Sequence, residues 1–420
     1  MTSSTSRRGW TVVLSALAIN LILGVLYAWG VTGKALVLEW HWTKAQAALP
    51  FTVSTASFAI TMIFAGRLQD RFGPKYVAML GGIVLGAGLA ASSFARTPQA
   101  MLLTFGVLGG LGIGLGYSAT MPPAVKWFPP KRKGLITGIV VSGVGLAAVY
   151  MSPLTDYLIR TFSIPQTFVM LGTGTMVLVV LLAQQITNPP PGYVTGPASS
   201  PVSGEANSGP ELDWPAMLRT GRFYLLWLMF VLSASAGLMI IMHVAIIAKE
   251  QARVDRWGFW LVALLALCNT LGRLVSGLVS DKIGRSRTML LAFLLQALNM
   301  FAFSYYTTPA LIVFGAAFTG ICYGGIFTLF PSTIADSYGI RHLGVNYGLL
   351  FTAFGVAGVT GPYLGGKLRD IVGSYALSYT SSALMLLGGA ALALFIQNAK
   401  AGSRGPLLPK AQPEIPALRD

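Results

Sequence analysis

Residues 66–73 read GRLQDRFG, and residues 277–284 read GLVSDKIG. Both stretches follow the pattern G-x-x-x-D-[RK]-x-G, and 211 positions separate them. Each follows a long apolar segment, so its charged residues mark the point where that segment ends. The same eight-residue pattern at two such points indicates that the chain contains two related halves.

Other residues repeat at nearly the same separation. Gly134, Gly138 and Gly145 are each followed by a glycine 210 positions later, and Pro122 is followed by Pro331 after 209 positions. A single glycine match would carry little weight, because small residues are common where membrane helices pack. Several matches in the same order indicate a duplicated structural unit.

The composition narrows the class of protein. The chain has 420 residues, of which 54% are hydrophobic and 10% are charged. Soluble domains carry about 25% charged residues, so the composition excludes a soluble protein, a disordered regulator and a secreted disulfide scaffold. A net charge of +16 would suggest a nucleic-acid partner in a soluble protein. In a membrane protein it reflects Lys and Arg in cytoplasmic loops.

Hydropathy predicts the fold class. A helix needs about 20 apolar residues to cross a bilayer, and a window of that length finds twelve apolar segments. We predict an all-α membrane protein whose twelve transmembrane helices form two pseudo-symmetric six-helix bundles. The predicted spans are 10–32, 46–66, 76–94, 100–121, 135–158, 166–187, 223–248, 258–279, 288–307, 310–334, 344–366 and 374–397.

The stretch between the two sets of spans is rich in Pro, Gly and Ser, which is typical of a linker. The predicted domains are an N-terminal bundle at 1–187, a cytoplasmic linker at 188–222, a C-terminal bundle at 223–399 and a disordered tail at 400–420. With both termini in the cytoplasm, 19 of the 29 Lys and Arg residues lie on the cytoplasmic side and 9 on the outer side. This bias predicts cytoplasmic termini.

One basic residue, Arg273, lies inside a predicted span, about two-thirds of the way through the eighth. An arginine at bilayer depth costs about 2.5–3.5 kcal/mol to insert and normally faces a watery cavity or a partner. Its counterpart in the first half is Met62, so the duplication is broken at this position. A guanidinium is a permanent, forked donor that suits a carboxylate. We therefore expect Arg273 to bind the carboxylate of an organic anion.

Two further polar residues of the spans are candidates. Asn269 precedes Arg273 by one helical turn on the same face, where it could donate to the same carboxylate or form an interhelical hydrogen bond. The spans have no central Asp or Glu, the usual proton carriers of pumps. His243 is the intramembrane histidine and the proton-coupling candidate, with a simple hydrogen-bonded histidine as the alternative.

Two six-helix halves, with the G-x-x-x-D-[RK]-x-G pattern after spans two and eight, resemble the major facilitator superfamily. The resemblance covers nearly the whole chain apart from the linker and tail. It implies a secondary transporter whose halves rock about a central site. We expect Gly66, Asp70, Arg71 and Asp281 to take part in conformational gating. A cation or the N-terminus of a neighbouring helix would hold Asp70 in one conformation.

Spans one, four, seven and ten line the central cavity in this superfamily, and this resemblance selects aromatic candidates. Tyr117 and Tyr323 lie in the corresponding spans four and ten, and Phe327 is one turn beyond Tyr323. Tyr27 in span one and Phe351 in span eleven are further candidates. Each could instead be an ordinary core or lipid-facing side chain.

A closer resemblance is to the monocarboxylate transporters and the oxalate/formate exchangers. It rests on RRGW at residues 7–10, YAWG at residues 27–30 and the arginine in span eight. It implies that this arginine binds substrate carboxylate. Animal monocarboxylate transporters have an aspartate where this chain has Asn269, and a lysine in span one where it has Val31, with Lys34 nearby. This chain therefore lacks both residues of the lysine/aspartate proton relay of that family.

The predicted span at 344–366 contains no Lys or Arg, whereas the oxalate exchangers have a lysine in span eleven. One buried cation balances one carboxylate, and a dianion would bring an uncompensated buried charge. We expect a small monocarboxylate such as lactate, pyruvate, acetate or formate. Proton symport is favoured because an anion that crosses the membrane alone moves its charge with or against the membrane potential. The alternatives are an oxalate/formate-type exchanger and a drug or sugar carrier of the same fold.

Other functional classes fit the sequence poorly. The spacing of His, Cys and acidic residues predicts no metal site, catalytic site or cofactor, and the linker is too short for a signalling domain. We therefore do not expect an enzyme, a channel or a sensor. The expected partners are a monocarboxylate anion, a proton and the lipid bilayer, with no nucleic acid. We expect a monomeric, multi-pass plasma-membrane protein, and the compact loops indicate a bacterial inner membrane.

Overall fold

The computed structural model describes residues 3–190, 193, 211–254 and 258–402. Within these ranges the regular elements are all helical and no strand occurs. The elements are α1 (Ser3–Leu23), η1 (Gly24–Ala28), α2 (Trp29–Glu39), α3 (Lys44–Phe72), α4 (Pro74–Ser92), α5 (Pro98–Met101), η2 (Leu102–Gly109), α6 (Gly110–Ser118), α7 (Met121–Lys126), η3 (Pro130–Arg132), α8 (Lys133–Thr161), α9 (Ile164–Ala183), α10 (Trp214–Leu218), α11 (Gly221–Ala252), α12 (Gly258–Ile283), α13 (Arg285–Phe303), α14 (Pro309–Tyr338), α15 (Leu343–Val372) and α16 (Ala376–Gly402).

In the described part of the chain, twelve helical segments of 19 to 33 residues are apolar enough to cross a membrane. The predicted all-α membrane fold with twelve transmembrane helices is therefore confirmed. The short helix α10 lies inside the stretch that we predicted as a linker. The rest of that linker at 191–192 and 194–210, and the predicted tail from 403 onward, lie outside the described residues.

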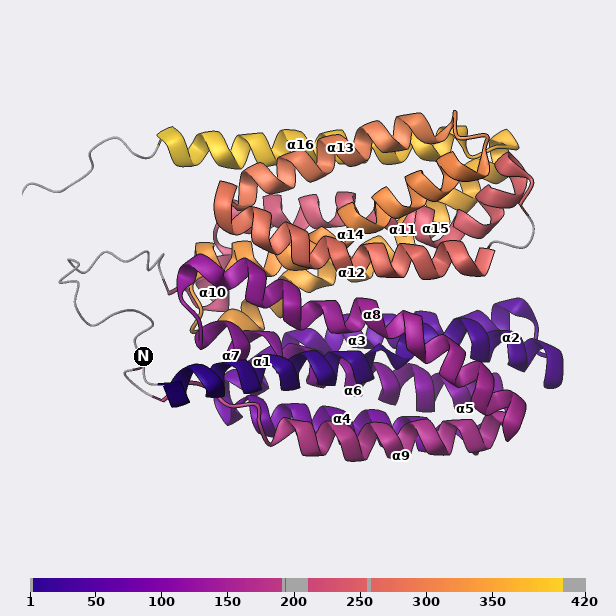
Figure 1. The fold of residues 1–420 in the computed structure, drawn as a ribbon, viewed down its shortest axis with the longest axis horizontal. Coiled ribbons are helices and arrows are strands. Elements are labelled where there is room, and N and C mark those ends of the chain that lie inside the picture. Colours follow the sequence, from indigo (N-terminus) through magenta and orange to yellow (C-terminus); the bar gives the residue numbers. More distant parts are fainter. Residues whose placement is uncertain (1–2, 191–192, 194–210, 255–257, 403–420) are drawn as a thin grey trace, which may run out of the picture.

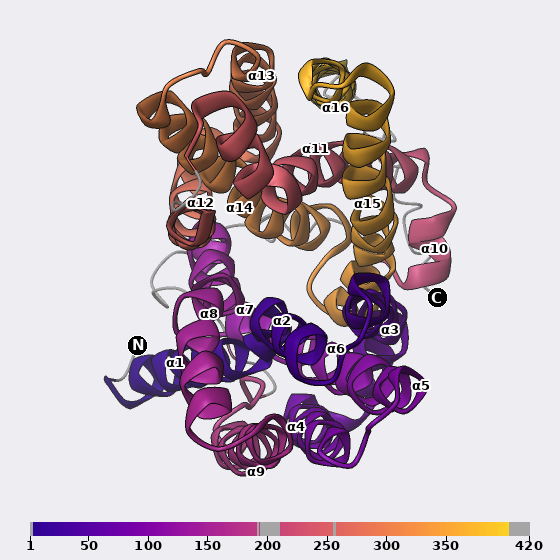
Figure 2. The same ribbon diagram turned by 90° about the vertical axis from the view of Figure 1, so that its right-hand side faces the viewer.

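The two halves of the sequence form two bundles that lie side by side. Figure 1 shows the first half, from indigo to magenta, below the second half, from red to yellow. Figure 2 shows the same two groups with most helices seen end-on. The halves meet along two helix pairs, where α8 packs on α12 and α3 packs on α15.

The last glycine of each copy of the repeated motif makes a tight turn between two spans. Gly73 connects α3 to α4 with a φ of 89°, and Gly284 connects α12 to α13 with a φ of 93°. Side chains with a Cβ rarely adopt this region of backbone conformation. The final position of the motif therefore requires glycine in both halves.

The first glycine of each copy lies where the two halves touch. A methyl group on Gly66 would collide with the backbone of Gly344, and one on Gly277 would collide with the backbone of Gly134. Two more of the repeated glycines lie against the backbone of the other half. Gly348 lies against Met62, and Gly138 lies against Arg273. The glycines that repeat along the sequence thus form the interface between the halves.

The eleventh span is longer than predicted. The sequence placed its end at residue 366, whereas α15 continues to Val372 and carries Lys367 and Arg369. Both cations follow the predicted end of the span, and they lie on the last turns of this helix instead of in a loop. Arg369 pairs with Glu250 on α11 at 2.5 Å and with Asp370 at 3.2 Å. Long charged side chains can extend from a helix toward water. The helix therefore continues beyond the apolar stretch, and this explains why its end differs from the predicted one.

Candidate transport site

Arg273 lies on α12 at the interface between the halves and is 2% exposed. Its Nε atom donates to the Oδ1 atom of Asn269 at 3.0 Å, and its Nη1 atom donates to the carbonyl oxygen of Val141 on α8. The hydroxyl of Thr328 on α14 donates to the Arg273 carbonyl at 2.9 Å. The side chain is therefore anchored on two sides, by its own helix and by a helix of the other half.

The charge of Arg273 has no acidic partner among the described residues. Its guanidinium carbon lies 4.7 Å from the ring centre of Phe327, so a cation–π contact offsets part of the cost of burial. An unpaired buried cation is costly for a protein to keep. In a membrane span it marks a place where an anion can bind.

Gly145 on α8 makes room for the guanidinium. A methyl group at this position would lie 3.4 Å from Nε and 3.6 Å from Cζ of Arg273. Because α8 belongs to the first half and α12 to the second, the space around the cation depends on how the two halves are packed. This arrangement allows occupation of the site to be coupled to a relative movement of the halves.

An aromatic cluster surrounds this region and joins the two halves. Phe351 on α15 is its centre, with ring centroids 5.0 Å from Phe58 on α3 and 5.8 Å from Tyr117 on α6. Phe327 continues the cluster toward Arg273, with its ring centroid 5.2 Å from that of Tyr323. We define the aromatic cluster as Phe58, Tyr117, Phe230, Tyr323, Phe327, Tyr347, Phe351 and Phe354.

Ring contacts connect most of the predicted residues to the cation. Phe327 contacts both Arg273 and Tyr323, and Phe230 lies within ring-contact distance of both Phe327 and Phe351. The structure therefore links Arg273, Asn269, Tyr117, Tyr323, Phe327 and Phe351 of the predicted set through the aromatic cluster and one hydrogen bond. Tyr27 is 38% exposed, and no ring contact joins it to the cluster among the described residues.

Four members of the cluster were not predicted from the sequence, namely Phe58, Phe230, Tyr347 and Phe354. Tyr347 precedes Phe351 by one turn of α15, and their ring centroids lie 5.6 Å apart. The i, i+4 spacing would have indicated that both share one helix face. Phe58 carries no comparable signal, because its pairing with Phe351 is a contact between the two halves.

His243 lies on α11 outside this cluster and faces the C-terminal part of α15. Its Nε2 atom is 3.1 Å from the carbonyl oxygen of Pro362, and its Nδ1 atom is 3.1 Å from the hydroxyl of Tyr375. A carbonyl can only accept, so Nε2 carries the proton and Nδ1 accepts from the tyrosine. A tyrosine has an ordinary pKa of about 10, so the Tyr375 hydroxyl carries its proton at neutral pH.

The second copy of the loop motif ties the halves together. Asp281 accepts hydrogen bonds of 2.9 Å from the N–H groups of Gly134 and Leu135, at the start of α8. It also pairs with Arg285 at 2.7 Å. Asp336 extends this network by pairing with Arg285 at 3.0 Å and with Lys133 of the first half at 3.2 Å. A carboxylate at a helix N-terminus is favoured by the exposed N–H groups and the helix dipole.

Asp70, in the first copy of the motif, makes fewer contacts with the other half than Asp281 does. Asp70 lies beside the N–H of Val345 at the start of α15 and interacts electrostatically with Lys126 and His342. Its two carboxylate oxygens are buried and make no well-formed hydrogen bond within the described chain. Arg71 is exposed and stacks its guanidinium over the ring of Phe72 at 5.3 Å. The two copies therefore occupy equivalent places but differ in their contacts.

Comparison with known proteins identifies the family. The sequence profile described as the Major Facilitator Superfamily matches residues 9–258 and 258–419. The chain belongs to the major facilitator superfamily.

The relatives and the fold support the same assignment. The chain is 30% identical over 361 residues to YhjX, an uncharacterised MFS-type transporter of Escherichia coli, covering 85% of this chain and 87% of the relative. It is 29% identical to the oxalate:formate antiporter of Oxalobacter formigenes, with coverages of 93% and 91%. It is 24% identical to monocarboxylate transporter 13 of Bos taurus, with coverages of 93% and 89%. The crystal structure of the human organic anion transporter MFSD10 has the same fold, with a TM-score of 0.68 at 14% identity over 92% of this chain and 99% of that one.

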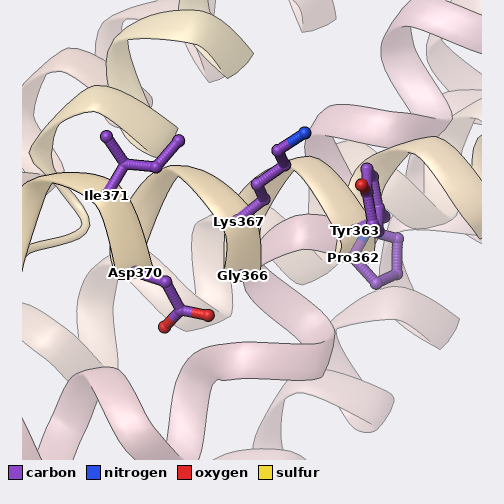
Figure 3. Close-up of a pocket in the computed structure, with 6 residues that line it drawn as sticks. All are labelled: Pro362, Tyr363, Gly366, Lys367, Asp370 and Ile371. Atoms are coloured by element: carbon purple, nitrogen blue, oxygen red, sulfur yellow. The ribbon is translucent and has the colours of Figure 1, made fainter.

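This major facilitator transporter also has a shallow surface pocket away from Arg273. Its lining comes from α15 alone, near the C-terminal end of that helix. Figure 3 shows Lys367 and Asp370 pointing to different sides of this helix. Lys367 lies 5.6 Å from the ring centre of Tyr363. Within the described ranges, no cluster of three or more His, Cys, Asp or Glu residues could hold a metal ion.

Proposed function

We propose that this transporter carries small monocarboxylates such as lactate or pyruvate, by proton symport with alternating access. The observation that carries the proposal is the buried guanidinium of Arg273, which has no acidic partner in the described chain and lies between the two halves. A substrate carboxylate would supply the missing negative charge with bidentate geometry. Alternating access then follows if the two halves rock about this site.

A single carboxylate suits this site better than two. Arg273 is the cation at the aromatic cluster, while Lys367 lies on the outer turns of α15 and is exposed. A second carboxylate next to Phe327 and Phe351 would be an uncompensated charge in an apolar setting. The hydrocarbon part of a monocarboxylate would instead bury apolar surface against these rings.

Proton symport would make the transport step electrically neutral. Moving one elementary charge against the membrane potential costs about 2.3 kcal/mol per 100 mV, and a proton that travels with a monoanion removes this cost. His243 is the proposed proton acceptor on the protein, with the Nδ1 atom as the site that changes its protonation. Protonation there would require the Tyr375 oxygen to change from donor to acceptor.

Uptake into proteoliposomes tests the proposal. An inward proton gradient should drive accumulation of labelled lactate, and Arg273→Ala should abolish it because the carboxylate loses its partner. Lys367→Ala provides the matched control, since it removes a cation outside the aromatic cluster and should leave uptake unchanged. Equal uptake by the wild type and Arg273→Ala would refute the proposal.

An oxalate/formate-type exchanger is the second candidate. Two observations favour it, namely the similarity to the oxalate:formate antiporter of Oxalobacter formigenes and the presence of Lys367 and Arg369 on α15. Counterflow separates the two functions. An exchanger loaded with formate takes up labelled oxalate without a proton gradient, whereas a lactate symporter does not.

We further propose that the protein is a monomer in the plasma membrane of a bacterium, the inner membrane. Both termini would lie in the cytoplasm. The proposed domain division is that of the sequence prediction, with two bundles joined by a cytoplasmic linker. The motif loops would then lie on the cytoplasmic side. In this orientation Gly66, Asp70, Arg71 and Asp281 would govern closure of the cytoplasmic end.

A further inference from the structure

The RRGW motif at the start of α1 has no part in the transport site. Arg7 and Arg8 are exposed on the first turns of this helix, and Trp10 is 38% exposed. Gly9 is buried, and a methyl group on it would lie 3.2 Å from the Cβ atom of Trp127. The motif therefore packs through its glycine and leaves its charged and aromatic side chains at the surface.

A second basic pair lies beside this motif. The ring of Trp10 meets that of Phe128 edge-on, with centroids 5.1 Å apart. Two prolines follow Phe128, and the exposed residues Lys131 and Arg132 come directly after them. The N–H of Arg132 donates to the carbonyl oxygen of Pro129 at 2.9 Å, and this turn keeps the pair close to the aromatic contact. Figure 1 shows α1 and α7 together at one end of the molecule. We define the basic patch as Arg7, Arg8, Trp10, Phe128, Lys131 and Arg132.

The second half reaches the same fold without this motif. The duplication places LRTG at residues 218–221 where the first half has RRGW, so one arginine and the tryptophan are missing there. The Thr220 hydroxyl instead lies 2.9 Å from the hydroxyl of Tyr338. None of the four cations of the basic patch forms an ion pair with a residue that the structure describes. Four exposed cations that the fold does not use indicate a ligand outside the protein.

We propose that the basic patch binds the headgroup of an anionic phospholipid. The patch lies at the ends of three membrane spans, Arg7–Glu39, Pro98–Lys126 and Pro130–Thr161, where lipid headgroups lie. Tryptophan favours the boundary between lipid and water, and clusters of Lys and Arg beside a span attract anionic lipids. The cations would donate hydrogen bonds to the lipid phosphate, and Trp10 and Phe128 would contact the upper part of the acyl chains. This inference does not depend on which acid the protein transports.

A role in membrane insertion alone is the competing explanation, because basic residues also set the orientation of a first span. That role ends once the protein is inserted, whereas lipid binding persists in the purified transporter. Lys131 and Arg132 separate the two explanations well, because they lie between two later spans. Arg219 and Arg287 supply the matched control, since both are exposed cations of the second half outside the basic patch.

Native mass spectrometry of the purified full-length transporter in detergent tests the proposal. The probes are phosphatidylglycerol and phosphatidylcholine with identical acyl chains, which differ in net headgroup charge. The wild type should bind phosphatidylglycerol with the lower Kd. Lys131→Gln combined with Arg132→Gln should raise this Kd roughly 25-fold, because each cation beside an anionic surface contributes about fivefold. Arg219→Gln combined with Arg287→Gln should leave it unchanged.

Several outcomes would overturn the proposal. Equal Kd values of the wild type for the two lipids would show that the headgroup charge is not recognised. An unchanged Kd after loss of Lys131 and Arg132, or an equal rise in the two double variants, would exclude the basic patch as the site. Displacement of phosphatidylglycerol by inorganic phosphate at the same concentration would indicate a site for free anions instead. The wild-type comparison needs no substitution, so it remains decisive even if a variant fails to fold.

Discussion

The Nε atom of Arg273 donates a hydrogen bond of 3.0 Å to the Oδ1 atom of Asn269, one turn earlier on α12. This bond sets the plane of the guanidinium, while the contact with the Val141 carbonyl holds one end of the fork against α8. An amide holds the cation without neutralising it. A carboxylate at the same place would form an ion pair with the guanidinium and compete with the substrate for it.

Replacing Asn269 tests this arrangement. We expect Asn269→Ala to raise the KM for lactate roughly three- to tenfold, because one hydrogen bond that orients Arg273 is lost. Asn269→Asp should be more severe, because the new carboxylate competes with the substrate for the guanidinium. Concentration dependence of initial uptake measures both. An Asn269→Asp variant with wild-type KM would contradict this role.

A methyl group at Gly145 would fill the space beside Arg273. In Gly145→Ala the new methyl would lie 2.9 Å from Oγ1 of Thr270 and 3.4 Å from Nε of Arg273. We expect a higher KM for lactate with normal insertion into the membrane. Gly355→Ala is the matched control from the other half, where the methyl would meet the Cβ of Ala59 at 3.2 Å and no cation. Equal effects of the two substitutions would show that packing, and not the cation, is responsible.

The contact between Asp281 and the start of α8 should stabilise one conformation. We expect Asp281→Asn to lower uptake several-fold and to widen the distance between spin labels at Tyr76 and Arg287, exposed residues of the two halves. The reason is the loss of a charged cap and of the pair with Arg285. Asp156→Asn provides the control, because its pair with Arg160 is exposed and worth little. Unchanged label distances in Asp281→Asn would argue against a gating role.

Proton coupling should depend on His243. We expect His243→Gln to abolish accumulation driven by a proton gradient, because the amide can replace the bond to Pro362 but cannot take up a proton. Exchange of external for internal lactate should continue, because it needs no net proton movement. Gradient-driven accumulation at the wild-type level in this variant would place the proton on another group.

The repeated pattern predicted the architecture because each position has a separate physical requirement. Gly73 and Gly284 adopt a backbone conformation that favours glycine, and Gly66 and Gly277 lie where the backbones of the two halves touch. These requirements are local or follow from the duplication, so they can be recognised in one sequence. The duplication also showed that Met62 of the first half corresponds to Arg273 of the second, and that the two residues differ.

The rest of the site depends on contacts between distant residues. No spacing in the sequence indicates that Phe58 meets Phe351 or that the Val141 carbonyl accepts from Arg273, since these pairs join the two halves. The end of the eleventh span was missed because hydropathy falls before the helix stops, and this placed Lys367 and Arg369 in a loop. The different contacts of Asp70 and Asp281 were also not predictable from two copies of one motif.

Thermal unfolding of the purified transporter with a series of carboxylates tests the central claim most directly. A ligand that binds the folded state raises its stability by about 2.7 kcal/mol at 100 times its Kd, so binding appears as a higher Tm. We predict that lactate and pyruvate raise the Tm of the wild type, that oxalate at the same concentration does not, and that Arg273→Ala shows no shift with any of them. A lactate-dependent shift of equal size in Arg273→Ala would contradict the account.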